Sequence, residues 1–382
     1  MAHALAGKPV QEQDIIDVQT IVDAYFDNVP DMTNPTQLVS FGTSGHRGTS
    51  VDGTFTDLHV AAITQAICDG RKQFGATGPI FVGQDTHALS QPALVTVLEV
   101  LAGNGVTAMV DCDMAFVPTP SVSRAIIRYN EEHDDKADGI IITPSHNPPD
   151  NGGIKYNTII GGPADTVVTK WIEMRANEYL TAYCESEDFK RISIDNIEPS
   201  AQVPYDYKGL YVEELGDVIN MEAIKEAGPK VLVDTLGGSG ASYWNAIKER
   251  YGLDLTIIHD DYDPTFSFMT YDHDGKVRMD CSSTYVMASV INRIGDFDLA
   301  VGNDPDYDRY GIVVSSGLIS ANIFLTLAAR YLFTTRGWKN KGVGKTVVCT
   351  TMIDKWAADA ETPVFEVPVG FKYFSQLLFD GA

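Results

Sequence analysis

The sequence predicts an α/β fold built from successive units, each with a mixed or largely parallel sheet. Short apolar runs rich in β-branched residues alternate along the chain with segments whose apolar residues recur at helical spacing. Polar side chains follow directly after two of these runs, at the edge where open α/β sheets bind ligands. A chain of 382 residues allows about two to three domains, each with its own core.

The first expected unit covers residues 36–200 and follows a polar leader at residues 1–35, which carries one expected helix near residues 11–27. Runs of strand-forming residues predict strands in this unit at residues 38–41, 80–82, 106–110 and 139–143. Helical spacing after polar capping candidates predicts helices that begin near Thr56, Ser90 and Ser121.

A second unit is expected at residues 201–314 and part of a third at residues 315–382. The same patterns predict second-unit strands at residues 230–234, 255–258 and 299–301, with a helix from about Ser242. In the third unit they predict helix, strand, helix, strand and a closing helix, with the first four at residues 321–333, 346–350, 352–360 and 364–367. The shared rhythm indicates a structural repeat without a visible residue repeat.

The composition excludes several classes of protein. Lys and Arg number 28 against 52 Asp and Glu, a net charge of −24, so a nucleic-acid binder or a protein that adheres to anionic membranes is not expected. No signal peptide and no apolar stretch long enough to span a bilayer is visible. The five cysteines are dispersed and odd in number, which favours a reducing cytoplasm over a disulfide framework.

The run at residues 139–143 ends at Pro144, and two more prolines follow at 148 and 149. Because proline disfavours the helical conformation of the residue before it, residues 145–147 are expected on a rigid, non-helical loop at the end of a buried strand. Lys155 is expected to add a cation after a flexible 151–153. We interpret Ser145 as a covalent carrier; the alternative is a plain loop hydroxyl.

A second polar stretch, residues 302–309, follows the strand expected at 299–301. If the loop is extended, Asp304, Asp306 and Asp308 point the same way, and carboxylates that converge need a cation between them. Oxygen ligands favour Mg²⁺ or a similar hard ion. An EF-hand is excluded because its register would place Arg309 and Ser315 where that loop requires Gly and Glu.

Three glycine-rich segments could contact phosphate. Residues 42–48 combine glycines with Arg47, which suits an anion, although a solvated turn is an equal alternative. Residues 236–240 lack the G-x-G-x-x-G spacing and are interpreted as a tight turn, and residues 342–346 are not a P-loop because position 339 is Lys. Residues 85–87, Asp-Thr-His, are interpreted as turn or cap residues.

A positioned hydroxyl, an oxygen-lined cation and nearby basic residues are the ingredients of phosphoryl transfer. A hydrolase triad is disfavoured, because Ser145 and His146 are adjacent and point opposite ways on an extended backbone. A metal-dependent phosphatase and a non-catalytic module that binds Mg²⁺ or sugar phosphates remain as alternatives.

Four segments, FGTSGHRG, TPSHNPPDNGGIKYN, NDPDYDR and VPVGFKYF, occur in the order found in the α-D-phosphohexomutase superfamily. Together they resemble most closely its bacterial phosphoglucomutase branch, from about residue 38 to the end of the sequence. The resemblance implies α/β units of the phosphohexomutase type, with the third incomplete and the fourth absent. It implies reversible interconversion of α-D-glucose 1-phosphate and glucose 6-phosphate through glucose 1,6-bisphosphate; a different hexose phosphate is the alternative.

The resemblance also implies roles for individual residues. Ser145 would be the phosphoserine and, with Asp304, Asp306 and Asp308, a ligand of Mg²⁺. His146 and Lys155 would assist proton transfer and charge stabilisation. Basic and loop residues would support the catalytic centre or bind substrate: Arg47, Arg309, Thr43, Ser44, Val369, Gly370 and Lys372.

Partners implied by the resemblance are small hexose phosphates, with no nucleic acid and no membrane, and a monomer or homodimer. Because binding energy from a remote phosphate helps such an enzyme reach its transition state, little or no turnover is expected from these 382 residues alone. An unfinished third unit is also expected to expose apolar surface.

Overall fold

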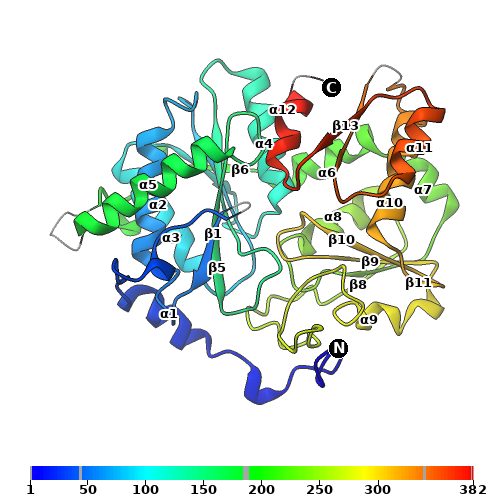
Figure 1. The fold of residues 1–382 in the computed structure, drawn as a ribbon, viewed down its shortest axis with the longest axis horizontal. Coiled ribbons are helices and arrows are strands. Elements are labelled where there is room, and N and C mark those ends of the chain that lie inside the picture. The colour runs from blue at the N-terminus through cyan, green and yellow to red at the C-terminus, as the bar shows by residue number, and fades with distance from the viewer. Residues whose placement is uncertain (1, 43–44, 184–188, 339–340, 380, 382) are drawn as a thin grey trace.

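The computed structural model describes residues 2–42, 45–183, 189–338, 341–379 and 381. Three α/β units follow one another along the chain, and each has its own sheet (Figure 1). The first two units lie side by side, with β1 and β5 of one facing β9 and β10 of the other across the middle of the molecule. The expected fold class, successive α/β units with mixed or parallel sheets, is confirmed.

The first sheet has six strands in the order β1-β5-β4-β2-β3-β6. Its strands are β1 (His46–Thr49), β2 (Ile80–Gln84), β3 (Ala108–Asp111), β4 (Asp138–Ile142), β5 (Asn151–Asn157) and β6 (Gln202–Tyr205). β2, β3, β4 and β6 run parallel, whereas β5 and β1 are antiparallel additions. The chain turns back across β2 to reach β4, so the strand order reverses between them, and ligands of open α/β sheets bind at such a reversal.

Helices cover both faces of this sheet. One face carries α2 (Asp57–Gly70), α3 (Ser90–Gly103) and α5 (Thr166–Tyr183), which pack on one another, and the other carries α4 (Thr119–Glu132) and α6 (Tyr207–Val218). The larger core lies under α2 and α3 and a smaller one under α4, around Phe81 and Ile126. β4 is buried along its whole length, as its apolar sequence predicts.

The second sheet has the order β11-β10-β9-β7-β8. Its strands are β7 (Val231–Asp234), β8 (Leu255–Ile258), β9 (Leu299–Asn303), β10 (Tyr310–Val314) and β11 (Gly317–Leu318), and its helices are α7 (Met221–Ala227), α8 (Ala241–Tyr251) and α9 (Ala288–Ile291). β7, β8 and β9 are parallel, and the order reverses between β7 and β9. The loops that leave these two strands therefore meet at the second sheet's ligand-binding edge.

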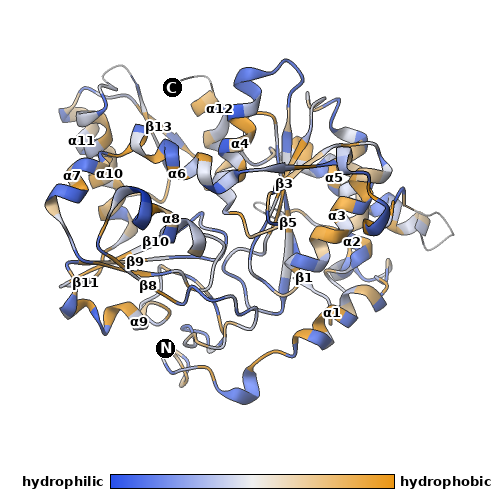
Figure 2. Ribbon diagram, turned by 180° about the vertical axis from the view of Figure 1, so that it is seen from behind, coloured by the Kyte–Doolittle hydropathy of each residue, from blue (hydrophilic) through white to orange (hydrophobic). Residues whose placement is uncertain are grey.

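The third unit pairs β12 (Val343–Thr346) with β13 (Val364–Val367) in parallel, beside α10 (Ala321–Thr335), α11 (Met352–Asp359) and α12 (Lys372–Phe379). The segment at residues 342–346 is a strand and not a P-loop, and Lys345 forms ion pairs with Asp354 and Glu366. Hydrophobic residues colour parts of α10 and α12 orange in Figure 2. As expected, this unit also exposes large apolar side chains. They include Leu327, Val347, Val348, Phe371, Leu378 and Phe379.

Two expected strands and one expected flexible loop differ from the structure. Residues 38–41 form no strand. The nearest strand along the chain is β1, where His46–Thr49 pairs with Asn151–Ile154. The strand expected at 346–350 lies instead at Val343–Thr346, where it pairs with β13. Residues 151–153 are not flexible: they begin β5, and a Cβ on Gly153 would collide with the Thr143 carbonyl group.

The leader, residues 1–35, contacts both of the first two units. Val10 N–H donates to Met269 O in the second unit, and Tyr271 N–H of that unit donates to Lys8 O in the leader. Further along, α1 (Val18–Asp27) begins at Asp17, whose carboxylate caps the helix, and buries Tyr25 in the first core. The leader therefore links the two units in space.

The boundary between the first and second units was expected after residue 200, but the last strand of the first sheet follows that position. β6 (Gln202–Tyr205) pairs with β3, so the first sheet ends beyond that point. Among the helices of the described residues, none is both long and apolar enough to cross a bilayer.

Candidate active site

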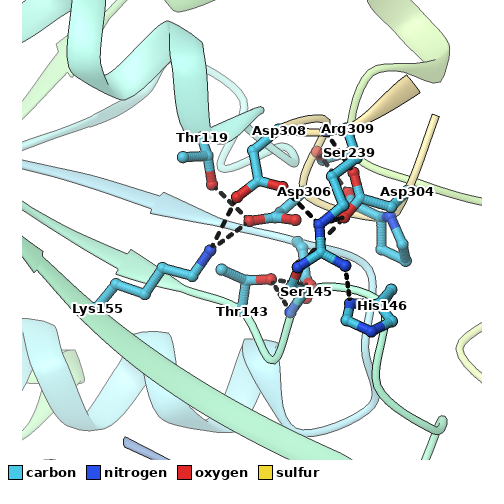
Figure 3. A network of polar contacts seen from close by, with 12 residues as sticks. Thr119, Thr143, Ser145, His146, Lys155, Ser239, Asp304, Asp306, Asp308 and Arg309 are labelled. Carbon is cyan, nitrogen blue, oxygen red and sulfur yellow. Dashed lines mark hydrogen bonds and ion pairs between the residues drawn. The ribbon is translucent and has the colours of Figure 1, made fainter. Parts of the chain in front are cut away.

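Two loops, one from each of the first two sheets, meet in a buried polar site (Figure 3). The Ser145 hydroxyl lies on the loop after β4, and Asp304 follows β9. Ser145 Oγ donates to Asp304 Oδ2 at 3.1 Å, and both residues are fully buried. Because both loops leave their sheets beside a reversal of strand order, two ligand-binding edges combine into one site.

Ser145 has a left-handed backbone, with φ of 63°. For a residue with a side chain this conformation costs about 1–2 kcal/mol, so surrounding contacts must hold it. One of them is local, since Ser145 N–H donates to Thr143 Oγ1 at 2.7 Å. The loop is therefore non-helical, as the prolines predict.

The three aspartates converge through a tight turn and not through an extended loop. Tyr307 N–H donates to Asp304 O at 2.9 Å, and Tyr307 has a φ of 62°. This turn joins β9 to β10 as a hairpin, with Asn303 opposite Tyr310. Carboxylate oxygens of Asp304, Asp306 and Asp308 all lie within 4.8 Å of one another. The expected cluster of carboxylates exists, but a tight turn brings the three side chains together. The expected cause was the alternation of side chains along an extended loop.

The glycine-rich turn at residues 236–240 packs against this aspartate turn. Ser239 donates to Pro305 O through both N–H and Oγ, each at 2.8 Å. A Cβ on Gly238 would lie 2.8 Å from Pro305 Cα, so only glycine allows this approach. The interpretation of this segment as a tight turn agrees with the structure, and its contacts hold the aspartate turn in place.

Asp306 receives two donors from the first unit. Lys155 Nζ, buried on β5, lies 2.6 Å from Asp306 Oδ2, and Thr119 Oγ1 donates to the same oxygen at 2.9 Å. Thr119 N–H, in the first turn of α4, also donates to Asp306 O, so the positive end of that helix faces the aspartate turn. Burial would raise the pKa of Asp306, but Lys155 and these hydrogen bonds outweigh it and lower the pKa.

The remaining carboxylate oxygens fit a hard cation. Burial and the neighbouring carboxylates raise the pKa of Asp304 and of Asp308. Asp306 Oδ1 and Asp308 Oδ1 are buried and accept no hydrogen bond. Buried anionic oxygens without donors are costly, and an oxygen-lined cluster of this kind selects Mg²⁺ or a similar ion. Asp304, Asp306 and Asp308 would hold the ion beside Ser145 Oγ.

Arg309 lies between the aspartates and His146. Its Nη1 donates to His146 Nδ1 at 2.5 Å, and its Nε lies 3.6 Å from Asp308 Oδ1. Burial and the nearby Arg309 lower the pKa of His146 to about 4, so the imidazole is neutral at neutral pH. Arg47, on β1, lies near enough to the same aspartates for its charge to interact with theirs. Positive charge thus gathers here within a strongly acidic chain.

Some expected site residues lie elsewhere. Val369 and Gly370 are not part of this network, and Lys372 Nζ donates instead to Thr166 Oγ1 at the start of α5. Thr43 and Ser44 lie outside the described residues.

Four residues in or beneath the site were not predicted to belong to it: Thr119, Thr143, Asp85 and His87. Thr143 Oγ1 donates to Asp85 Oδ2 at 2.6 Å beneath the Ser145 loop. The position of Asp85 and His87 after β2 could have indicated them, since β2 and β4 flank the reversal of strand order. Nothing in the sequence near Thr119 places it opposite Asp306.

Replacing Asp306 with asparagine should weaken Mg²⁺ binding by at least about tenfold, because it removes one anionic ligand from the cluster. Isothermal titration calorimetry with MgCl₂ measures the affinity. Asp23→Asn is the matched control, since Asp23 is exposed on α1 and belongs to no acidic cluster of this kind among the described residues. Equal affinities for the two variants would contradict the assignment.

A buried serine joined to an aspartate cluster across two α/β units defines a multi-unit α/β protein with a composite site. Models of the phosphoglucomutase/phosphomannomutase family match all three units: alpha/beta/alpha domain I at residues 38–182, domain II at 210–317 and domain III at 320–382. The chain belongs to the phosphoglucomutase/phosphomannomutase family, which confirms the resemblance seen in the sequence.

Individual relatives agree with this assignment. The chain is 47% identical to a phosphoglucomutase of Komagataeibacter xylinus over 98% of its own length and 68% of the relative's. It is 28% identical to phosphoglucomutase 1 of Saccharomyces cerevisiae, over 88% and 61% of the two lengths. The chain therefore spans about two thirds of the length of these relatives.

Solved structures share the fold. A putative phosphomannomutase from Thermus thermophilus superposes with a TM-score of 0.74 at 24% identity, over 90% of this chain and 72% of the other. The phosphoprotein pp63/parafusin from Paramecium superposes with a TM-score of 0.72 at 19% identity, over 93% and 65%.

Proposed function

We propose that the protein interconverts α-D-glucose 1-phosphate and glucose 6-phosphate through a phosphoserine at Ser145 and bound glucose 1,6-bisphosphate. The observation that carries the proposal is the Ser145 hydroxyl, buried and 3.1 Å from Asp304 in an aspartate cluster suited to a hard cation. Membership of the family and 47% identity to a phosphoglucomutase support the sugar. Another hexose phosphate is the alternative substrate.

Each half-reaction exchanges one bond for another. The P–O bond to Ser145 Oγ breaks, the phosphorus bonds to a free sugar hydroxyl, that hydroxyl loses its proton and Ser145 Oγ gains one. In the second half-reaction the P–O bond between the sugar and the other phosphoryl group of the bisphosphate breaks, the phosphorus bonds to Ser145 Oγ, and the proton of Ser145 Oγ passes to the sugar oxygen. Mg²⁺, when bound, would offset negative charge on the phosphoryl oxygens.

The basic side chains act mainly through charge. Burial lowers the pKa of Lys155, but the charges of Asp306 and Asp308 raise it, and the net effect is a rise. Lys155 is therefore an ammonium ion whose charge balances the aspartates. His146 is neutral, but its Nδ1 accepts from Arg309, so a proton could be taken there only after that contact opens. Arg309 and Arg47 are placed to bind phosphoryl oxygens of the substrate.

Replacing Ser145 with alanine should abolish phosphorylation of the chain. We expect the purified protein, after exposure to glucose 1,6-bisphosphate and MgCl₂, to carry one phosphoryl group that peptide mass spectrometry places on Ser145. Ser50→Ala, at a buried serine bonded to Ile21 O, is the matched control and should keep the modification. A parent chain that is never phosphorylated, or a modification that persists in Ser145→Ala, would contradict the proposal.

The same preparations separate the alternatives. A non-catalytic module would bind Mg²⁺ without becoming phosphorylated, and a phosphatase would release inorganic phosphate steadily. We expect little or no sugar-phosphate interconversion by these 382 residues alone, because the relatives extend beyond the part that this chain matches. We also propose a reducing, cytoplasmic location, with a monomer or a homodimer as the oligomeric state.

A further inference from the structure

A second polar network lies beneath the Ser145 loop and touches no reacting atom. Its centre is Asp85, at the end of β2 and 1% exposed. The Asp85 carboxylate accepts from Thr143 Oγ1 at 2.6 Å, Ser90 Oγ at 2.6 Å, His87 Nδ1 at 2.9 Å and His87 N–H at 3.0 Å. A carboxylate that accepts four hydrogen bonds fixes the direction of each one.

That direction determines what Thr143 does. Because the carboxylate can only accept, the Thr143 hydroxyl must donate to Asp85, which leaves its lone pairs for the N–H of Ser145. This N–H belongs to the residue with the left-handed backbone. The Asp85–Thr143 bond therefore supports the strained conformation that turns Ser145 Oγ toward Asp304.

His87 holds the other side of the loop. Its Nε2 lies 3.1 Å from Asn147 O and its Nδ1 lies 2.9 Å from the Asp85 carboxylate, so each ring nitrogen faces an acceptor. Its ring also packs on Phe266 of the second unit, with centroids 5.0 Å apart. His87 thus ties the segment after Ser145 to β2 and touches the unit that carries the aspartates.

We propose that Asp85, His87 and Thr143 are positioning residues for phosphoryl transfer at Ser145. They hold the backbone on both sides of the serine, so that its hydroxyl stays within reach of the aspartate cluster. The phosphorylation readout of this proposal rests on the proposed function. The hydrogen-exchange readout depends only on the geometry of the loop.

The test compares Thr143→Val, which keeps the shape but lacks the hydroxyl, with Thr143→Ser, which keeps the hydroxyl. We expect the single-turnover rate of Ser145 phosphorylation by saturating glucose 1,6-bisphosphate to fall about 10- to 100-fold in Thr143→Val, since a displacement of about 1 Å has such effects. Thr143→Ser should remain near the parent rate, and Mg²⁺ affinity should be unchanged in both. Thr64→Val, at a buried threonine bonded within α2, is the matched control.

A parent-like rate in Thr143→Val, or an equal loss in Thr143→Ser or Thr64→Val, would overturn the proposal. Hydrogen exchange of a peptide covering residues 143–150 provides a second readout that needs no phosphorylation. Protection should fall in Thr143→Val and stay parent-like in Thr143→Ser; unchanged protection in Thr143→Val would also overturn it. If the parent is never phosphorylated, the proposed function fails, while the exchange measurement still decides the role of the network.

Discussion

Replacing Arg71 with methionine should destabilise the first unit by about 3–5 kcal/mol, the usual cost of stranding one charge of a buried pair. Arg71 Nε and Nη2 donate to Asp138 at 2.6–3.1 Å, and the Asp138 carboxylate is fully buried. Tyr156 OH also donates to Asp138, at 2.7 Å. With the guanidinium gone, one phenol donor would remain for a buried carboxylate.

Urea denaturation measures this effect, with hydrogen exchange of α2 to assign the transition to the first unit. The matched control is Arg124→Met, which removes a bidentate pair with Glu214 that is partly solvated and should cost no more than about 1 kcal/mol. Adding Asp138→Asn to Arg71→Met should recover part of the loss, because the buried charge is then absent. Equal costs at Arg71 and Arg124 would show that burial does not set the energy of the pair.

Acidification from pH 7 to pH 5 should also destabilise the first unit, by about 3–4 kcal/mol from two buried histidines. His46 and His59 stack with ring centroids 5.2 Å apart. Each Nδ1 accepts a backbone N–H, from Ser40 and Thr56 respectively, and each Nε2 lies beside a carbonyl oxygen. Both rings are therefore neutral, with the proton on Nε2.

The sign follows from burial. Burial lowers the pKa of His46 to about 3 and that of His59 to about 4, against 6.5 in the unfolded chain. Below pH 6.5 the unfolded state binds protons that the folded state does not, so stability is lost as the pH falls toward 4. At pH 7 and above this effect is absent.

His59→Gln isolates the contribution of one ring. Glutamine at this position of a helix can still accept from the Thr56 N–H but does not titrate. We expect the loss of stability between pH 7 and pH 5, measured by urea denaturation, to shrink by about half in the variant. An unchanged pH dependence would show that His59 does not take up a proton on unfolding in this range.

Local patterns were sufficient where a short run rich in apolar and β-branched residues lies between turns. The strands at residues 255–258 and 364–367 occur as expected, because β-branched runs bounded by turns have few other stable conformations. Local patterns failed where a segment becomes a strand only by pairing with a neighbouring strand. His46–Thr49 contains three polar residues and a glycine, and it is a strand only because β5 lies beside it.

The candidate site divides in the same way. Ser145 and the aspartates could be selected from the sequence because each follows a buried strand, where sheet geometry exposes the next residues to ligand. The contacts of Asp306 with Lys155 and Thr119 could not be predicted from the sequence. In each of these contacts, the two residues lie more than 150 positions apart along the chain. Asp85 and His87 lie in the turn after β2, as expected, but only the tertiary structure shows their contacts with Thr143 and Asn147 under the Ser145 loop.

The sequence by itself therefore determined the α/β class, the family and the residues with reactive or ligating side chains. Those features depend on apolar periodicity and on side-chain chemistry, which are local properties. The tertiary structure alone decided how the three aspartates converge, which donors neutralise Asp306 and what holds Ser145 in its left-handed conformation. Each of these depends on strand pairing and on close approach between units, which arise only when distant segments pack together.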